Sequence, residues 1–425
     1  MQHQMKKQLT IFLLSVTFFS FAQTENDWKK SAFTFTPEIL LGLTMEANHG
    51  FPDTKLQKQI VLNFGRDHTN NPQQWAQRLK APKTGFSIGI TDFGNLDSLG
   101  YAITAMPYIE FKAFGSEKWS VLTGMGASYF TKKFNAETNP LNQAVTTDVT
   151  WAFRMYLYYR FLSLKSSDLR VGLGYSHHSN GHTRLLNQGY NSFLLSLSAA
   201  IKNPLKYPEI DSEENIPLYK KTVHNYFALR GGLGQNVFAL AFNDKKNVYT
   251  IAGEYGRVYN KTFKIGLGFY YRFYQHYYDY IEGNESLVQA GREFDYFKGN
   301  PWYYASNLGI TVHGEIFLNH VGIDLQLGYN LHKPAYKLEW RINEGWDNTP
   351  RVISKTWVLG ELDGSYKRKH RISSRLGLKY YLIGMEKAPK NNFYLGAHLN
   401  ANLGQADFTE LSFGYVHSFN FQERK

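Results

Sequence analysis

The sequence predicts an all-β protein: a closed antiparallel transmembrane β-barrel of about 14 strands, within a range of about 12 to 16. Three observations support this fold class. Aromatic residues make up 16% of the chain, with 30 Tyr and 31 Phe, which suits strands with interfacial girdles. Apolar and polar residues alternate over segments longer than most soluble strands. Beyond the N-terminal region, no uncharged apolar stretch reaches the roughly 20 residues that a membrane helix needs.

The N-terminus has the pattern of a signal peptide over residues 1–22. Lys6 and Lys7 precede an apolar run from Leu9 to Phe21, and Ala22 supplies the small residue before cleavage. A membrane anchor is the alternative, but the run is shorter than the roughly 20 residues that a helix needs. Export leaves two expectations, a soluble periplasmic protein or one that spans a membrane as strands, and the strand pattern favours the cell outer membrane. Export also argues against nucleic acid as a partner, although the net charge is +12.

Composition also limits the chemistry. The chain contains 0 Cys, which excludes disulfides, thiolate metal sites and a cysteine nucleophile. No cofactor motif is present in the sequence, and no cofactor is expected.

Period-two patterning defines the strands. In Phe263–Phe273, apolar residues alternate with Lys264, Gly266 and Arg272, and Val321–Leu331 follows the same pattern. Each segment matches the about 9–11 residues of a tilted membrane strand. An aromatic-rich segment near residues 411–421 closes the chain. The expected strands lie near residues 84–92, 101–114, 118–130, 144–162, 168–179, 189–202, 222–233, 246–257, 262–275, 306–318, 320–331, 370–384, 391–403 and 408–421.

Connection lengths predict the orientation of the barrel. The long connections 131–143, 276–305 and 332–369 all fall on one side, which is external if both the N- and C-termini are periplasmic. Most connections on the periplasmic side are short. The link 203–221 is an exception, because it is long and holds two prolines and an acidic run.

The expected organisation is one barrel over residues 84–425, with no second domain and no internal repeat. Residues 23–83 are less regular than the rest. They are expected to form either a periplasmic lead-in or an extra hairpin built from Phe33–Leu43 and Lys58–Phe64.

A polar cluster spans the external hairpin at residues 175–191. Strand parity places His177, Ser179 and Asn191 on the outer, lipid-facing wall at the level of the headgroups. His178 has the opposite parity and is expected to point into the barrel. The candidate site therefore lies on the outer wall of the barrel.

These residue types suit ester hydrolysis. A His two residues from a Ser on one strand face can activate the hydroxyl as a general base, because neutral imidazole accepts a proton near pH 7. Asn191 on the neighbouring strand can orient the imidazole. The candidate oxyanion donors are backbone N–H groups near Asn180 and Gly181, and the Asn187 amide.

Two other interpretations of the cluster stay open. Ser, Asn, Gly and His are common in turns, so the segment can be a polar hairpin tip without chemistry. A zinc site from His177, His178 and His182 is the second alternative, although neighbouring strand residues face opposite sides.

The cluster resembles the PagL-type lipid A 3-O-deacylase, or acyloxyacyl hydrolase, family of small eight-stranded outer-membrane barrels. The family motif is His-x-Ser-Asn, then Asn-x-Gly, then Glu. The matching residues are His177, Ser179, Asn180, Asn187 and Gly189, with Asn191 at the Glu position. The likeness covers roughly residues 103–200, with weaker similarity at Pro107–Phe111 and Gly124–Ser128.

The resemblance implies removal of an ester-linked acyl chain from lipid A by Ser179, with His177 as base and no metal. It implies lipopolysaccharide in the outer leaflet as the partner, and a homodimer is possible. Asn191 departs from the motif, because an amide can orient an imidazole but cannot offset the imidazolium charge. Arg184, Lys132 and Lys133 can hold lipid A phosphates or be ordinary solvated charge.

The alternative function is a non-enzymatic barrel, a pore or an adhesin, with a degenerate deacylase site. The residues that would line a polar channel are Arg154, Arg160, Asp324, Arg375 and Lys379. The loop aromatics that would contact a partner are Trp302, Tyr303, Trp340 and Trp346.

Overall fold

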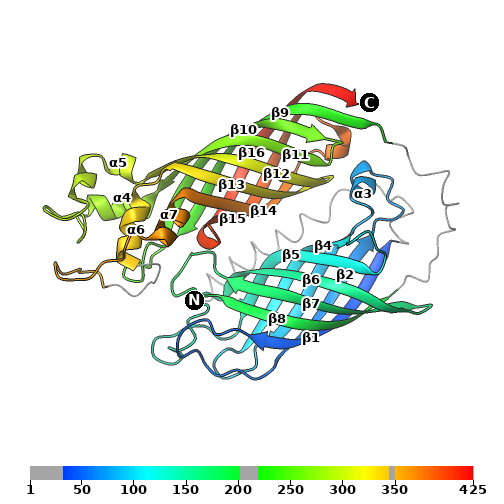
Figure 1. Cartoon of the computed structure of the whole chain (residues 1–425), viewed down its shortest axis with the longest axis horizontal. Helices are drawn as coiled ribbons and strands as arrows, with labels where there is room; N and C mark the ends of the chain where they lie inside the picture. The colour runs from blue at the N-terminus through cyan, green and yellow to red at the C-terminus, as the bar shows by residue number, and fades with distance from the viewer. Residues whose placement is uncertain (1–31, 202–218, 344–349, 425) are drawn as a thin grey trace, which may run out of the picture.

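The strands form two closed antiparallel barrels of eight strands each (Figure 1). The computed structural model describes residues 32–201, 219–343 and 350–424. The first barrel consists of β1 (Phe33–Thr44), β2 (Gln57–Asp67), β3 (Lys83–Asp92), β4 (Tyr101–Lys112), β5 (Trp119–Phe130), β6 (Val149–Ser163), β7 (Ser167–Ser179) and β8 (Tyr190–Ile201). The second consists of β9 (Lys221–Asn236), β10 (Lys246–Tyr259), β11 (Phe263–Tyr274), β12 (Ser306–Leu318), β13 (Val321–His332), β14 (Ile372–Tyr381), β15 (Asn391–Asn402) and β16 (Gln405–Arg424).

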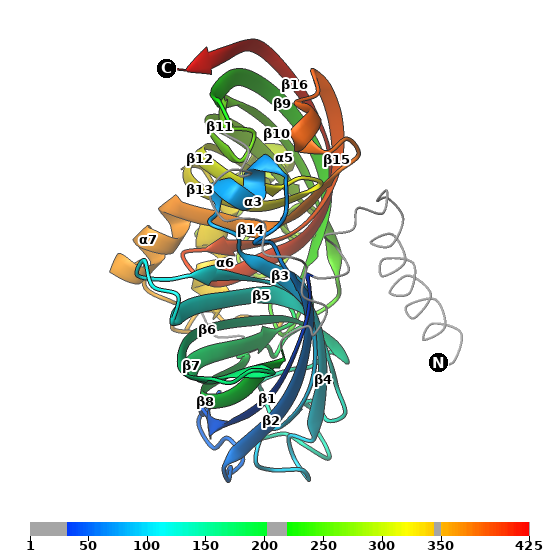
Figure 2. The same ribbon diagram turned by 90° about the vertical axis from the view of Figure 1, so that its right-hand side faces the viewer.

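Each barrel closes by pairing its first strand with its last. In the first barrel β1 pairs with β8, so that Ile39 lies opposite Leu197. In the second barrel β9 pairs with β16, so that Leu233 lies opposite Leu411. Figure 2 shows β9–β16 above β1–β8 as two separate rings of strands. The prediction of one barrel of about 14 strands over residues 84–425, without a second domain, is therefore wrong.

The error has a physical reason. Alternation is a property of each strand by itself, and every expected strand is present. Closure depends instead on which distant strands pair, and a repeat of two residues carries no information about that choice. The link 203–221, the exception in the loop pattern, joins β8 to β9 and so marks the boundary between the barrels.

The region before residue 84 completes the first barrel. The extra hairpin is confirmed, because β1 and β2 pair with each other and β2 pairs with β3. The alternative of a periplasmic lead-in is wrong for this stretch, which adds only the short helix α3 (Gln74–Arg78) between β2 and β3. The predicted signal peptide, residues 1–22, lies outside the described residues.

The two faces of the wall differ in polarity. Leu173, Leu195 and Leu197 lie on the outer face of the first barrel, and Leu195 is 66% exposed. Inside, Arg154 Nη2 lies 2.7 Å from the Glu38 carboxylate. Lipid favours the apolar outer face, and an eight-stranded barrel is just wide enough for its inward side chains to fill it.

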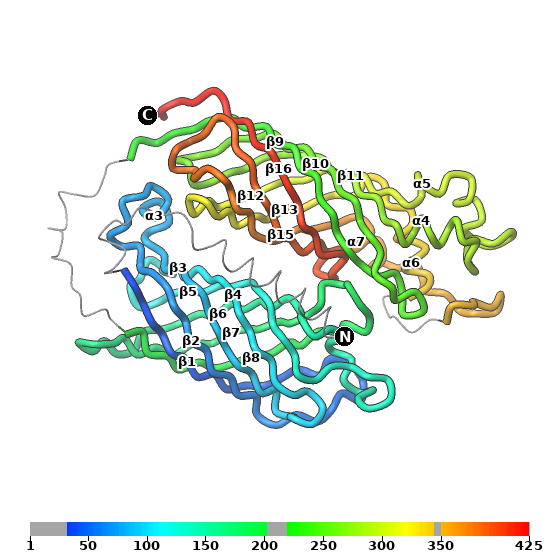
Figure 3. Tube along the Cα trace, turned by 180° about the vertical axis from the view of Figure 1, so that it is seen from behind, coloured from blue at the N-terminus to red at the C-terminus, as the bar shows by residue number. Residues whose placement is uncertain are grey.

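The two ends of the molecule are different. The four helices in the long connections of the second barrel gather at one end (Figures 1 and 3). They are α4 (Gln275–Glu282), α5 (Pro301–Tyr304), α6 (Ala335–Asn343) and α7 (Gly364–Arg371), with the 3-10 turn η1 (Asp295–Gly299) among them. The opposite end carries α3, the turn η2 (Met385–Lys387) and the C-terminus.

Among the described residues, no helix is both long and apolar enough to cross a membrane.

Candidate functional site

The candidate site lies where β7 ends and β8 begins. In the ladder, His177 is opposite Asn191 on β8, and Ser179 is opposite Trp151 on β6. His177 and Ser179 are two residues apart on one strand, so both face the outside of the wall. The structure thus brings His177 and Asn191 together directly and places Ser179 at the end of the same face.

The imidazole of His177 is held by Asn191. Its Nδ1 lies 2.8 Å from Asn191 Oδ1, and the Tyr175 hydroxyl donates to the same oxygen at 2.5 Å. An amide oxygen only accepts, so Nδ1 carries the proton and Nε2 keeps its lone pair. This is the tautomer that a general base needs on the Nε2 side. The role of Tyr175 could not be predicted from the sequence, although strand parity places it on the same face as His177.

The two atoms on which ester hydrolysis would depend are the Ser179 hydroxyl and His177 Nε2. Within the described part of the chain, neither the Ser179 hydroxyl nor His177 Nε2 makes a hydrogen bond. Ser179 is only 5% exposed, so the hydroxyl sits in a recess of the wall and not on a free surface. Ser179 and His177 share a strand face, but among the described residues no hydrogen bond joins them. General-base activation requires that hydrogen bond, which in some sites tightens only when substrate binds.

Gly189 lies beneath the imidazole. Its φ of +76° belongs to the left-handed region, and an added Cβ would come within 2.9 Å of His177 Cε1. Its N–H donates to the Ala144 carbonyl at 2.9 Å. A residue with a side chain at position 189 would therefore push the ring away from its place.

The loop after Ser179 is organised by two asparagines. Asn187 Oδ1 accepts the backbone N–H of Asn180 at 2.8 Å. The Asn180 side chain donates to the Arg184 carbonyl at 2.6 Å and accepts the N–H of Thr183 at 3.1 Å. Asn180 is thus occupied in holding the loop. Within the described residues, the Asn187 Nδ2 group and the N–H of Gly181 remain without partners.

The three histidines proposed as zinc ligands lie in different places. His178 points into the barrel and packs edge-on against Phe93 and Phe130, with ring centroids 5.8 and 5.5 Å away. His177 is outside the wall, and the His182 carbonyl accepts a hydrogen bond from Val237 of the second barrel. A shared zinc ion is therefore incompatible with the fold.

The rim cations differ in their surroundings. Lys133 forms an ion pair with Asp148. Lys132 and Arg184 are exposed, and the described residues provide no acidic partner for either. Lys132 and Arg184 are the two that keep their charge available at this rim.

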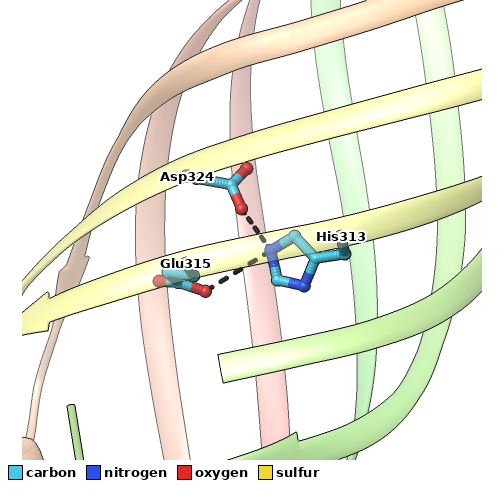
Figure 4. A group of neighbouring side chains, drawn as sticks. All are labelled: His313, Glu315 and Asp324. Carbon is cyan, nitrogen blue, oxygen red and sulfur yellow. Dashed lines mark hydrogen bonds and ion pairs between the residues drawn. The ribbon is translucent and has the colours of Figure 1, made fainter. Parts of the chain in front are cut away.

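The one cluster with metal-ligand geometry among the described residues lies inside the second barrel (Figure 4). It consists of His313, Glu315 and Asp324. Lys379 Nζ lies 3.0 Å from Glu315 Oε2, 2.9 Å from Asp324 Oδ1 and 3.5 Å from His313 Nε2. An ammonium group thus stands where a cation would bind, and the residues present do not fit a metal ion.

Apolar outer faces and polar, filled interiors define the chain as an outer-membrane β-barrel protein, here with two barrels in tandem. Its first barrel matches the family model described as lipid A 3-O-deacylase (PagL), over residues 42–200. This match confirms the resemblance found in the sequence.

Other comparisons are more distant. Curated protein sequences include no match to the chain. Among solved structures, the chain is similar to the outer membrane enzyme PagL, with 14% identity, a TM-score of 0.28, and coverage of 38% of this chain and 97% of that one. It is also similar to CdiB from Acinetobacter baumannii, with 8% identity, a TM-score of 0.15 and coverage of 91% and 60%. A third is the COG4313 outer membrane channel from Pseudomonas putida F1, with 9% identity, a TM-score of 0.18 and coverage of 94% and 100%.

Proposed function

We propose that the first barrel is a serine esterase that removes an ester-linked acyl chain from lipid A in the outer leaflet. The observation that carries this proposal is the outward-facing His177, which lies two residues before Ser179 and bonds Asn191. These residues lie in a segment that matches a deacylase family model. The proposal places the long-loop end of the molecule outside the cell and both termini in the periplasm.

The reaction follows from the tautomer of His177. Nε2 takes the proton from the Ser179 hydroxyl while Oγ attacks the ester carbonyl carbon. The tetrahedral oxyanion accepts hydrogen bonds from Asn187 Nδ2 and the N–H of Gly181, the two donors left free in the loop. The ester C–O bond then breaks, and Nε2 returns its proton to the departing lipid A hydroxyl. Water attacks the acyl-serine by the same route and releases a fatty acid.

Asn191 sets the expected rate. It holds the imidazole in the correct tautomer, as an acid would, but it brings no negative charge to the imidazolium that forms. Turnover is therefore expected to be slow relative to a site with Glu at this position.

The pore alternative is disfavoured by the interiors. Arg154 and Arg170 of the first barrel are buried and paired with Glu38 and Glu110, each at 2.7 Å. The second barrel holds a network of buried ion pairs that joins Lys264, Lys379, Arg230 and Arg375 to Glu254, Glu315, Asp324 and Glu410. Arg272 and Lys333 are also buried, and both lie within ion-pair distance of Asp407. Paired charges that fill the interior of an eight-stranded barrel argue against a water-filled channel through it. Of the expected channel residues, Arg160 pairs with Asp168 and is partly exposed.

The adhesin alternative keeps one observation in its favour. Trp302 and Tyr303 of the helical end are exposed. Trp340 is buried, and its Nε1 donates to the Glu361 carbonyl, so it supports the fold of that end. Trp346 lies outside the described residues.

The test is mass spectrometry of lipid A incubated with the purified full-length protein in detergent. The wild type is expected to release one fatty acid, and Ser179→Ala is expected to abolish the release. Ser176→Ala is the matched control, because Ser176 points inward and bonds the Tyr156 hydroxyl at 3.1 Å. Release that persists in Ser179→Ala overturns the serine mechanism, and an inactive wild type overturns the enzyme and favours the adhesin.

A further inference from the structure

The two barrels meet at both ends of the molecule. At the external end, Trp151 Nε1 donates to Thr409 Oγ1 at 2.9 Å. At the opposite end, Arg78, the last residue of α3, donates to the Tyr219 carbonyl at 2.9 Å, and the N–H of Gln74 donates to the Glu386 carboxylate at 3.2 Å. The external contact joins residues 258 positions apart in the chain.

The external contact falls on the candidate site. Trp151 is the cross-strand neighbour of Ser179. Gly181, two residues after Ser179, has a φ of +66°, and an added Cβ would lie 2.4 Å from Thr409 Oγ1 and 3.0 Å from Leu399 Cδ1. The second barrel therefore packs directly on backbone that follows the nucleophile, and only glycine fits at position 181.

The same contact continues along the loop. Asn243, in the connection between β9 and β10, accepts the N–H of Leu185 at 2.8 Å and donates to the Leu185 carbonyl at 2.5 Å. One side chain thus satisfies both backbone groups of a buried residue, as a neighbouring strand would. Leu185 lies two positions before Asn187.

The loop needs such support because it lies outside the strand ladder. From the first barrel, Thr146 donates to the Leu186 carbonyl at 2.9 Å, and Asn180 bonds Arg184. From the second barrel come Asn243 on Leu185 and the Val237 N–H on His182. The loop is therefore held between the barrels. Displacement of a catalytic group by about 1 Å can cost about 100-fold in rate, so the position of Asn187 matters.

We infer that the second barrel is a positioning module for the site on the first. Asn243 and Thr409 are positioning residues: they touch no substrate, and they fix the loop that carries Asn187 and Gly181. This inference rests on the proposed esterase function.

The test compares Asn243→Ala with Arg78→Ala in the full-length protein. Each variant removes a side chain that crosses between the barrels, but only Asn243 touches the loop. Deacylation of lipid A in detergent micelles gives kcat and KM. Hydrogen exchange of the peptide covering residues 180–189 reports the order of the loop without requiring activity.

Asn243→Ala is expected to lower kcat about tenfold or more with little change in KM, and to speed exchange in the loop. Arg78→Ala is expected to leave both unchanged. If Asn243→Ala keeps the wild-type kcat and its loop stays protected from exchange, the positioning inference is overturned and the proposed esterase function is not affected. If the wild type itself is inactive, the esterase fails, and exchange in the loop alone decides whether the second barrel holds it.

Discussion

A trio of Tyr, His and Asn occurs on the outer wall of each barrel, but only the trio on the first barrel has a serine beside it. On the first barrel, Tyr175 and His177 bond Asn191 Oδ1 at 2.5 and 2.8 Å. On the second barrel, Tyr415 and His417 bond Asn391 Oδ1 at 2.7 and 2.8 Å. In both, the His and Asn are directly opposite in the ladder.

The difference lies in what surrounds each trio. Two residues beyond His177 stands Ser179, whereas two residues beyond His417 stands Phe419, whose ring stacks on the imidazole at 5.8 Å. The first trio borders the asparagine-rich loop, and the second borders the opposite end of its barrel, where η2 lies. An oriented imidazole on a barrel wall is therefore not evidence of catalysis by itself. Tyr, His and Asn also suit a membrane interface, where one end of each side chain is wet.

The largest expected effect separates the two histidines. His177→Ala is expected to lower kcat for lipid A deacylation by about 1,000-fold or more, because Ser179 loses its base. His417→Ala, which removes the same contacts at the other place, is expected to stay within about twofold. Initial rates of fatty acid release measure both. Equal losses would mean that both trios support the wall and neither performs chemistry.

A smaller effect is expected at the partner of each histidine. Asn191→Glu is expected to raise kcat about tenfold or more, because a carboxylate offsets the imidazolium that forms in the transition state. Asn391→Glu is the matched substitution on the second barrel and is expected to leave kcat unchanged. The same release assay applies. An unchanged or lower rate in Asn191→Glu would show that the amide is the better partner in this setting.

The smallest effect is expected from introducing a serine beside the His417 trio on the second barrel. Phe419→Ser places a serine two residues from His417, but β16 continues past it to Arg424 in place of the asparagine-rich loop that follows Ser179. No gain in release is expected when this change is made in the inactive Ser179→Ala protein. Measurable release from that double variant would show that a Ser, His and Asn on a strand face suffice without the loop.

The strands and the candidate site could be predicted from the sequence because both depend on local order. His177, Ser179 and Asn191 share a face through strand parity, and His178 takes the other face for the same reason. The two closures could not be predicted, since they depend on β8 returning to β1 and β16 to β9.

The hydrogen-bonding roles of the loop residues could not be predicted from the sequence either. Asn180 belongs to the family motif and was a candidate oxyanion donor, yet its groups hold Arg184 and Thr183 in place. Which asparagine stays free is decided by hydrogen bonds within a folded loop. The contact of Asn243 with Leu185 joins segments with no pattern in common, so no spacing rule reveals it.

The contact between Trp151 and Thr409 also restricts the directions from which a lipid can diffuse laterally to the candidate site. Lipids reach a wall-mounted site by two-dimensional diffusion, and the second barrel stands on the β6 flank of Ser179. Arrival is left to the β8 flank, where Phe193 and Leu195 are exposed beside Asn191. In the proposed esterase, a lipid that approaches along the leaflet would therefore meet Asn191 and His177 before it meets Ser179.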